Sequence, residues 1–165
     1  IEKQGLVLLC EALTAIGDQF AVYGYSGQGR HQVDFVVVKD FDDLVTGRAG
    51  AKLGGMVPLQ QNRDGAAIRH ATTKLLARQA KTRLLVMISD GRPLDDGYKD
   101  DYSLEDTRMA LREARASGIE PVCFTIDKQA DPYVRRMYGD VRYVVIDRVE
   151  GLPEKLPRIY HRLTA

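Results

Sequence analysis

An acidic residue, Asp90, comes just after an unbroken apolar run, Leu84–Ile88, with the polar Ser89 between them. An unbroken apolar run of this length between helical patterns predicts a strand buried on both faces of a parallel sheet. Ligands of open α/β sheets bind outside the carboxyl ends of the strands, so Asp90 is a candidate cation ligand. Alternatively, Asp90 hydrogen-bonds its own turn, which Gly91 and Pro93 continue. This segment alone leaves both interpretations open.

Oxygen-bearing side chains occur in three segments that we expect to meet at the same edge of the sheet. These segments are 25–27, 61–64 and 89–91, and they offer hydroxyl, amide and carboxylate oxygens. Hard cations such as Mg²⁺ prefer oxygen ligands and retain several waters. Zinc prefers clustered His and Cys ligands, whereas His31, His70 and His161 are scattered along the sequence. The pattern therefore favours magnesium or manganese over zinc.

Several of these polar residues also have a purely structural interpretation. Asn62 and Asp64 precede a helical pattern, and capping such a helix is a usual role for both residue types. The acidic loop that contains Asp95 and Asp96 is either a solvated turn or a second site for a cation or partner. The sequence alone leaves these alternatives open.

Known catalytic motifs give no support for an enzyme. The sequence contains no GxxxxGK[ST] or GxGxxG phosphate-binding loop and no GxSxG nucleophile elbow. One enzymatic alternative is a magnesium-dependent hydrolase or phosphotransferase that uses Asp90. That chemistry needs a general base and a phosphate cradle, and the sequence around Asp90 shows no convincing candidate for either.

Composition narrows the class of protein. The 165 residues include 24 Lys and Arg against 23 Asp and Glu, which gives a formal net charge of +1. This balance of charges argues against non-specific electrostatic binding to nucleic acid or to an anionic membrane. No apolar stretch approaches the roughly 20 residues that a membrane-spanning helix needs. Cys10 and Cys123 lie in apolar contexts typical of buried, reduced thiols, which fits a cytoplasmic protein.

Hydrophobic periodicity predicts alternating strands and helices. The expected helices are 6–16, 41–52, 66–80, 103–117, 131–138 and a closing helix with Leu152, Leu156, Ile159 and Leu163; the expected strands are 20–25, 31–39, 84–89, 119–126 and 141–146. Ser103 and Asp106 have the spacing of a capping box. The alternation predicts a single α/β domain over 1–165, with a doubly wound, mostly parallel sheet and one antiparallel edge strand.

The segment Leu85–Pro93 resembles the fourth strand of a von Willebrand factor A domain, which ends in an aspartate of the metal site. Further stretches make the resemblance specific to one group of these domains. They are Gly65–Ala71, Glu105–Arg108, Glu113–Arg115, Phe124–Asp127 and Leu156–Tyr160. Together they resemble the carboxyl-terminal domain of nitric-oxide-reductase activation proteins of the NorD type and of their Rubisco-activating relatives.

The resemblance implies a metal-ion-dependent adhesion site in which Asp90 is a ligand. Asn62 stands where the family has a threonine and offers an amide oxygen instead. The family's DxSxS motif is absent from the sequence, so we expect it, with the first central strand, upstream of Ile1; the chain would then be a carboxyl-terminal fragment. A degenerate A domain without metal is a further alternative.

The implied function is binding rather than catalysis. An Asp or Glu of a protein partner would complete the coordination of Mg²⁺ or Mn²⁺. The implied partner-binding residues are Ser26, Gly27, Arg63, Asp64, Gly91 and Arg92. By analogy with the family, the protein would be an adaptor for a MoxR-type AAA+ ATPase that activates a target enzyme.

Overall fold

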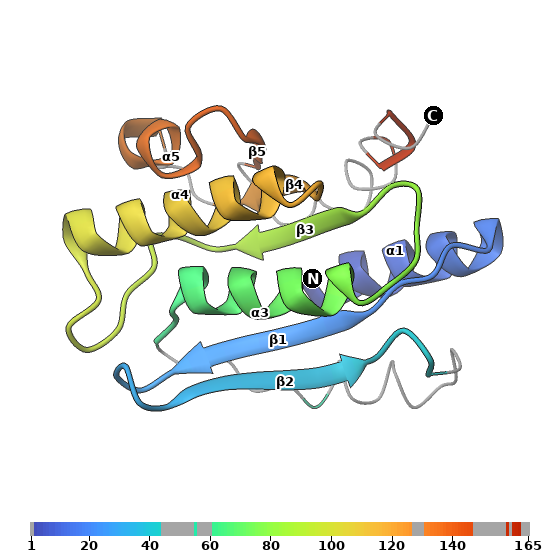
Figure 1. The fold of residues 1–165 in the computed structure, drawn as a ribbon, viewed down its shortest axis with the longest axis horizontal. Coiled ribbons are helices and arrows are strands. Elements are labelled where there is room, and N and C mark those ends of the chain that lie inside the picture. The colour runs from blue at the N-terminus through green and yellow to red at the C-terminus, as the bar shows by residue number, and fades with distance from the viewer. Residues whose placement is uncertain are drawn as a thin grey trace. The chain divides into compact units, whose positions relative to one another are not determined.

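The structure is a computed structural model and describes residues 2–43, 55, 61–126, 131–146, 158 and 160–162. Its elements, in chain order, are α1 (Glu2–Ile16), β1 (Val22–Gly27), β2 (Val33–Lys39), α3 (Asp64–Leu76), β3 (Leu84–Ser89), α4 (Asp100–Ala116), β4 (Glu120–Thr125), α5 (Asp131–Tyr138) and β5 (Arg142–Val145) (Figure 1). The predicted α/β class is confirmed. The helix predicted over 41–52 and the closing helix with its apolar stripe fall largely outside the described residues.

The chain divides into two compact units. The first comprises Ile1–Gly24, Phe35–Leu59 and Arg148–Ala165, and the second comprises Tyr25–Asp34 and Gln60–Asp147. The segments predicted to carry chemistry, 25–27, 61–64 and 89–91, all belong to the second unit, so the site is described within that unit.

β1 and β2 form the predicted antiparallel hairpin, and among the described strands they make a sheet of their own (Figure 1). The backbone N–H of Gln28 donates to the carbonyl of Gln32 at 2.8 Å, which closes the turn between them. β1 begins two residues later than predicted and runs to Gly27. The hydroxyl of Ser26 is therefore held in a strand rather than in a loose turn.

In the first unit, α1 ends at Ile16, where Gly17 adopts a positive φ of 80°. This helix end agrees with the sequence prediction, because glycine adopts that backbone conformation without steric cost. A buried lysine, Lys39, ends β2, and its ammonium group donates to the carbonyls of Phe20 and Asp40 at 2.9 Å. These bonds satisfy a charge that burial would otherwise make costly.

The second unit contains the predicted parallel sheet, with the strand order β3–β4–β5. Leu84 is paired with Glu120 and Ser89 with Thr125, so β3 and β4 end side by side. Both neighbours of β4 are parallel to it, as expected for strands joined through helices. The predicted additional strand upstream of Ile1 stays a prediction.

Three helices accompany this sheet. α3 contacts β3 and α4, while α4 contacts β4 and lies between α3 and α5. Along α4 the buried residues include Leu104, Leu111 and Ala114, a spacing that keeps them on one helical face. They join one hydrophobic core, whose other members include Ile68, Met87, Cys123, Val134, Met137 and Tyr138.

The start of α4 corrects the sequence prediction. Ser103 was expected to precede the helix as its N-cap, but α4 begins at Asp100 and its N-cap is Lys99. The hydroxyl of Ser103 donates to the carbonyl of Asp100 inside the first turn at 3.1 Å. Asp106, the expected second half of the capping box, is instead hydrogen-bonded by Tyr98 and Arg69, so tertiary contacts override the local motif.

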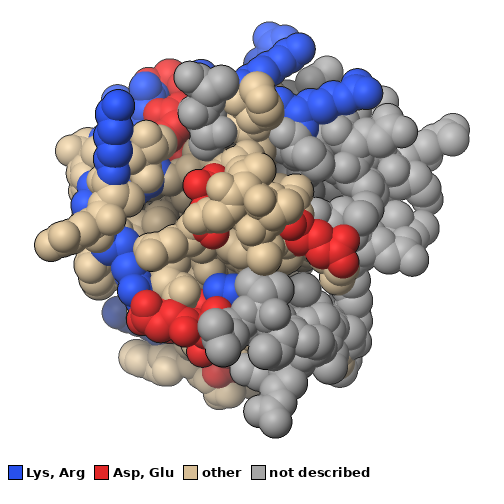
Figure 2. All heavy atoms as spheres, turned by 90° about the vertical axis from the view of Figure 1, so that its right-hand side faces the viewer, with Lys and Arg blue, Asp and Glu red and all other residues tan. Residues whose placement is uncertain are grey.

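None of the helices in the described part of the chain has the length and apolar character that crossing a membrane requires. Figure 2 presents one face of the molecule, on which acidic and basic side chains are interspersed wherever the residues are described. This mixture agrees with the nearly neutral composition.

Candidate functional site

Two of the three segments that were predicted to meet, 25–27 and 61–64, are hydrogen-bonded to each other within the second unit. The carbonyl of Gln61 accepts hydrogen bonds from the Ser26 hydroxyl and from the Gly27 backbone N–H, each at 3.0 Å. Asn62 and Leu94 exchange two bonds of 2.9 Å: Asn62 N–H donates to the Leu94 carbonyl, and Leu94 N–H donates to Asn62 Oδ1. The end of β1, the start of α3 and the loop after β3 are thereby held together.

Asn62 does not cap α3. The N-cap residue is Arg63, and no side chain forms a capping hydrogen bond there. The amide oxygen of Asn62 instead accepts one bond from the loop after β3. A carbonyl oxygen has two lone pairs, so one acceptor position on Oδ1 is left for a further donor or cation.

Asp64 is the first residue of α3 and is fully buried. The hydroxyl of Tyr25 donates to its Oδ1 at 3.0 Å, whereas Oδ2 is buried without a partner among the described residues. The capping role considered for Asp64 is therefore wrong. The pKa of the Asp64 carboxyl is raised to about 7. Burial is the main cause, the negative charges of Asp90 and Asp106 add to it, and the hydrogen bond from Tyr25 opposes it.

Asp90 lies directly after β3, as predicted, and its side chain is exposed. The turn that follows is closed by Ser89, whose hydroxyl donates to the Gly91 carbonyl at 2.9 Å and accepts from the Gly91 N–H at 3.4 Å. Because Ser89 supplies these bonds, the carboxylate of Asp90 is not needed to hold the turn. Its negative charge contributes to raising the pKa of Asp64.

Arg63 lies inside the protein. Its Nε donates to Oδ2 of Asp95 at 2.5 Å, a terminal nitrogen donates to the Asp96 carbonyl, and the guanidinium lies over the ring of Tyr98. The side chain of Asp95 is fully buried and also accepts a bond from the Gly29 N–H. The loop after β3 therefore contains a buried ion pair between Arg63 and Asp95 and is not a fully solvated turn. Through these bonds Arg63 connects the start of α3 to that loop.

The ion pair predicts a dependence of stability on pH. Burial raises the pKa of Asp95, but bonds from Gly29 and Arg63 outweigh burial and bring its pKa below the usual value. A lowered pKa contributes stability that is present above the unfolded-state pKa of about 3.9 and is lost as pH falls through the folded pKa. We therefore expect the stability difference between wild type and Asp95→Asn to shrink below about pH 4. Urea unfolding at pH 3 to 7 measures it, and a constant difference would contradict the assignment.

Arg92 is exposed, and its guanidinium lies 4.6 Å from the ring centre of Tyr133. Gly91 is half-buried beside it. Of the predicted partner-binding residues, Arg92 is thus the one that presents a charged group at the surface, whereas Ser26 is buried and donates to Gln61.

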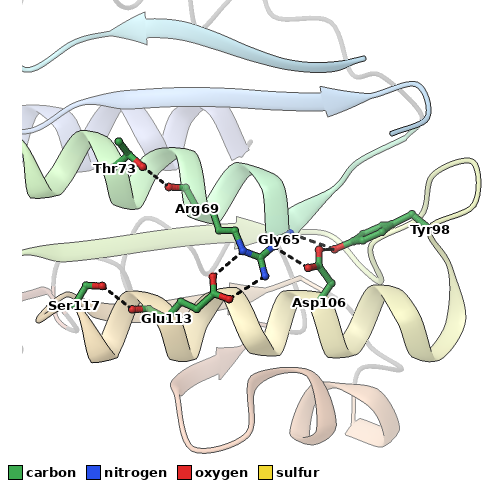
Figure 3. Close-up of polar contacts among 7 residues, drawn as sticks. All are labelled: Gly65, Arg69, Thr73, Tyr98, Asp106, Glu113 and Ser117. Atoms are coloured by element: carbon green, nitrogen blue, oxygen red, sulfur yellow. Dashed lines mark hydrogen bonds and ion pairs between the residues drawn. The ribbon is translucent and has the colours of Figure 1, made fainter. Parts of the chain in front are cut away.

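A polar clamp joins the first turns of α3 to α4, as Figure 3 shows. The hydroxyl of Tyr98 accepts from the Gly65 N–H at 3.3 Å and donates to Asp106 at 2.6 Å. Arg69 donates to Asp106 at 2.8 Å and to Glu113 at 2.7 Å. The clamp fixes Gly65, the residue after Asp64. Sequence reasoning did not identify it, because Tyr98 and Arg69 look like ordinary surface residues and Asp106 looks like part of a capping box.

The clamp leaves no room for a side chain at position 65. A Cβ on Gly65 would overlap the carboxylate of Asp106. We expect Gly65→Ala to lower the free energy of unfolding by about 1–3 kcal/mol, the usual cost of overpacking. Gly91→Ala is the control, because a Cβ there meets nothing within 4 Å. Equal losses for both variants in urea unfolding would contradict the proposed crowding.

The side-chain oxygens of Asn62, Asp64 and Asp90 are ligands of the kind that a hard cation prefers, but they are few. The described residues contain no group of three His, Cys, Asp or Glu side chains placed to hold a metal. Mg²⁺ commonly binds through one or two carboxylates and keeps several waters, and the buried Oδ2 of Asp64, which has no partner among the described residues, is an oxygen that a cation would satisfy. The residues present therefore fit a magnesium-type site that is partly completed by water or by a partner.

Comparisons with known proteins agree with the resemblance. An uncharacterized protein of Pseudomonas aeruginosa is 43% identical over 159 residues, which cover 96% of this chain and 26% of that protein. Protein NorD of Brucella melitensis is 34% identical over 99% of this chain and 26% of its own length, and Protein NorD of Stutzerimonas stutzeri is 39% identical over 86% of this chain and 23% of its own length. The chain spans about a quarter of the length of these relatives.

The family described as "Cobalamin biosynthesis protein CobT VWA domain" matches residues 38–162, which is most of the chain. The match includes the start of α3, the strand β3 and the residue Asp90 that follows it. The chain therefore belongs to this family of von Willebrand factor A domains.

Proposed function

We propose that this protein is a non-enzymatic binding module that holds Mg²⁺ or Mn²⁺ at Asp90 and uses the ion to bind an acidic residue of a protein partner. The observation that carries the proposal is the exposed carboxylate of Asp90 directly after β3, together with a buried carboxylate oxygen at the start of α3, Oδ2 of Asp64, that lacks a partner in the described part of the chain. A divalent cation supplies the positive charge that this arrangement lacks.

Asn62 is the second proposed donor. One lone pair of its Oδ1 is used by the Leu94 N–H, which fixes the orientation of the amide. The other lone pair is available to the cation, directly or through a water. Ordering a ligand by a hydrogen bond to a neighbouring group is a common property of metal sites.

The exposed side chains around Asp90 would form the rim that contacts the partner. Arg92 is suited to an acidic segment, because a guanidinium forms strong, charge-assisted bonds with carboxylates. Ser26, Gly27 and Arg63 would contribute indirectly, since their hydrogen bonds hold the segments of the site together. The fit is to a protein with a protruding Asp or Glu.

The biological setting that we propose comes from the family resemblance. The relatives named NorD are about four times as long as this chain. In this setting the module is a cytoplasmic adaptor that presents a target enzyme to a MoxR-type AAA+ ATPase.

Two measurements on the full chain separate this function from a hydrolase. Electron paramagnetic resonance follows the loss of the free Mn²⁺ signal on binding, and the release of 4-nitrophenol from 4-nitrophenyl phosphate follows turnover. We expect saturable Mn²⁺ binding that is lost in Asp90→Ala, together with no turnover. Metal-dependent turnover that disappears in Asp90→Ala would favour the hydrolase, and no binding by wild type would favour a degenerate A domain.

A further inference from the structure

The first turn of α3 receives its cap from another element of the second unit. The N-cap residue, Arg63, forms no side-chain capping bond, so the first N–H groups of this helix lack their usual local acceptor. The N–H of Gly65 instead donates at 3.3 Å to the hydroxyl of Tyr98, which belongs to the loop after β3 (Figure 3). Tyr98 therefore does for α3 what the side chain of an N-cap residue usually does.

A charged acceptor orients the Tyr98 hydroxyl. The hydroxyl donates its proton to Oδ2 of Asp106 at 2.6 Å, and Asp106 is itself held by Arg69 at 2.8 Å. Burial and the bond to Asp106 raise the pKa of Tyr98, so the hydroxyl keeps its proton at neutral pH. Because that single proton is committed to Asp106, the oxygen presents its lone pairs to the Gly65 N–H.

Tyr98 also lies at the far end of the loop that begins at Asp90. Tyr98 and Asp95 exchange two backbone hydrogen bonds of 2.9 Å, which close this end of the loop. The start of α3 is bonded to the loop at two further points, through Asn62 and Arg63. Of these three connections, the one through Tyr98 continues to α4. Its hydroxyl therefore fixes both polar segments against a third element.

We propose that Tyr98 is a positioning residue of the candidate cation site: by capping α3 from the loop after β3, its hydroxyl fixes the oxygen-bearing start of α3 against the loop that begins at Asp90. This inference rests on the proposed function, because the ion is the one proposed at Asp90. Tyr98 does not touch the ion, and it acts through the Gly65 peptide. Groups that orient metal ligands in this indirect way commonly change metal affinity by about 10- to 100-fold.

Calorimetric titration of the full chain with Mn²⁺ tests the proposal through Tyr98→Phe, which removes the hydroxyl and keeps the ring. We expect this variant to bind Mn²⁺ about tenfold more weakly than wild type. Arg69→Met is the matched control, because it breaks the ion pairs with Asp106 and Glu113 and leaves the bond between Tyr98 and Gly65. Any fall in its melting temperature should leave Mn²⁺ binding as in wild type, which separates positioning from a general loss of stability.

Amide hydrogen exchange followed by NMR gives a readout without metal. The Gly65 N–H should be protected from exchange in wild type and in Arg69→Met. In Tyr98→Phe its exchange should accelerate about tenfold, the equivalent of one lost hydrogen bond. The N–H of Ala67, which donates to the Arg63 carbonyl, is the internal reference and should change less. Equal exchange of Gly65 in wild type and in Tyr98→Phe would show that the hydroxyl is not its cap.

The outcomes separate the two claims. If Tyr98→Phe binds Mn²⁺ as tightly as wild type while Asp90→Ala does not bind it, the inference is overturned and the proposed function stands. The inference is also overturned if Arg69→Met weakens binding as much as Tyr98→Phe does, because any loosening of α3 from α4 would then suffice. If wild type itself does not bind Mn²⁺, both claims fail.

Discussion

Replacing Asp95 with alanine is expected to lower the free energy of unfolding by about 3–5 kcal/mol, the cost of removing one partner from a buried ion pair. The side chain of Asp95 is fully buried and that of Arg63 is 9% exposed, so alanine would leave the guanidinium charge largely without compensation. The Gly29 N–H would also lose its acceptor. Urea unfolding followed by circular dichroism measures the loss.

Two variants identify the cause of that loss. Asp96→Ala changes the neighbouring exposed aspartate and is expected to alter stability by no more than about 0.5 kcal/mol, as surface substitutions usually do. The double variant Arg63→Met, Asp95→Ala should recover part of the loss, because it removes the unpaired charge as well. A double variant less stable than Asp95→Ala alone would show that the ion pair is not the source of the effect.

The second large effect concerns the cation. At a Mg²⁺ concentration of about 100 times the dissociation constant, the bound ion should stabilise the folded protein by about 2.7 kcal/mol. Asp90→Ala should abolish this stabilisation, since it removes the exposed carboxylate at the end of β3. Thermal unfolding with and without Mg²⁺ measures both.

Asp96→Ala again provides the comparison, because it removes a nearby exposed acid without touching the end of β3. It should retain the full Mg²⁺-dependent rise in melting temperature. Equal rises in wild type and Asp90→Ala would mean that the ion binds elsewhere or without specificity.

The parallel sheet was predictable from the sequence because its strands carry strong local signals. The unbroken apolar run Leu84–Ile88 is typical of a strand in a parallel sheet, and it placed Asp90 correctly just after the end of β3. Gly17 and Gly118, each with φ of 80°, ended helices where the sequence predicted. These features depend on neighbouring residues alone.

The interior of the site was not predictable in the same way, because its contacts join distant segments. Arg63 and Asp95 are 32 residues apart, and in the sequence each looks like an exposed charge. Asp64 looks like a helix cap, and its burial depends on Tyr25, 39 residues earlier. One signal in the sequence could have identified Asp64: it is an acidic residue just inside the start of a helix that follows a loop rich in polar residues. Local propensity, however, favours the interpretation of such a residue as a helix cap.

The boundary of α4 shows the same competition. Ser103 and Asp106 fit a capping box, and local reasoning had no reason to reject it. The hydroxyl of Tyr98 and the guanidinium of Arg69 instead take both oxygens of Asp106, and the helix starts at Asp100. Tertiary hydrogen bonds with a charged acceptor are stronger than a local cap, so they decide the outcome.

Locating the bound ion directly would test the central claim, which is that Asp90 holds a divalent cation. Crystals of the protein grown with Mn²⁺ and measured near the manganese absorption edge give an anomalous difference map that marks the metal alone. A single peak within coordination distance of Asp90 is the predicted result. A peak away from Asp90, or none at a saturating Mn²⁺ concentration, would contradict it.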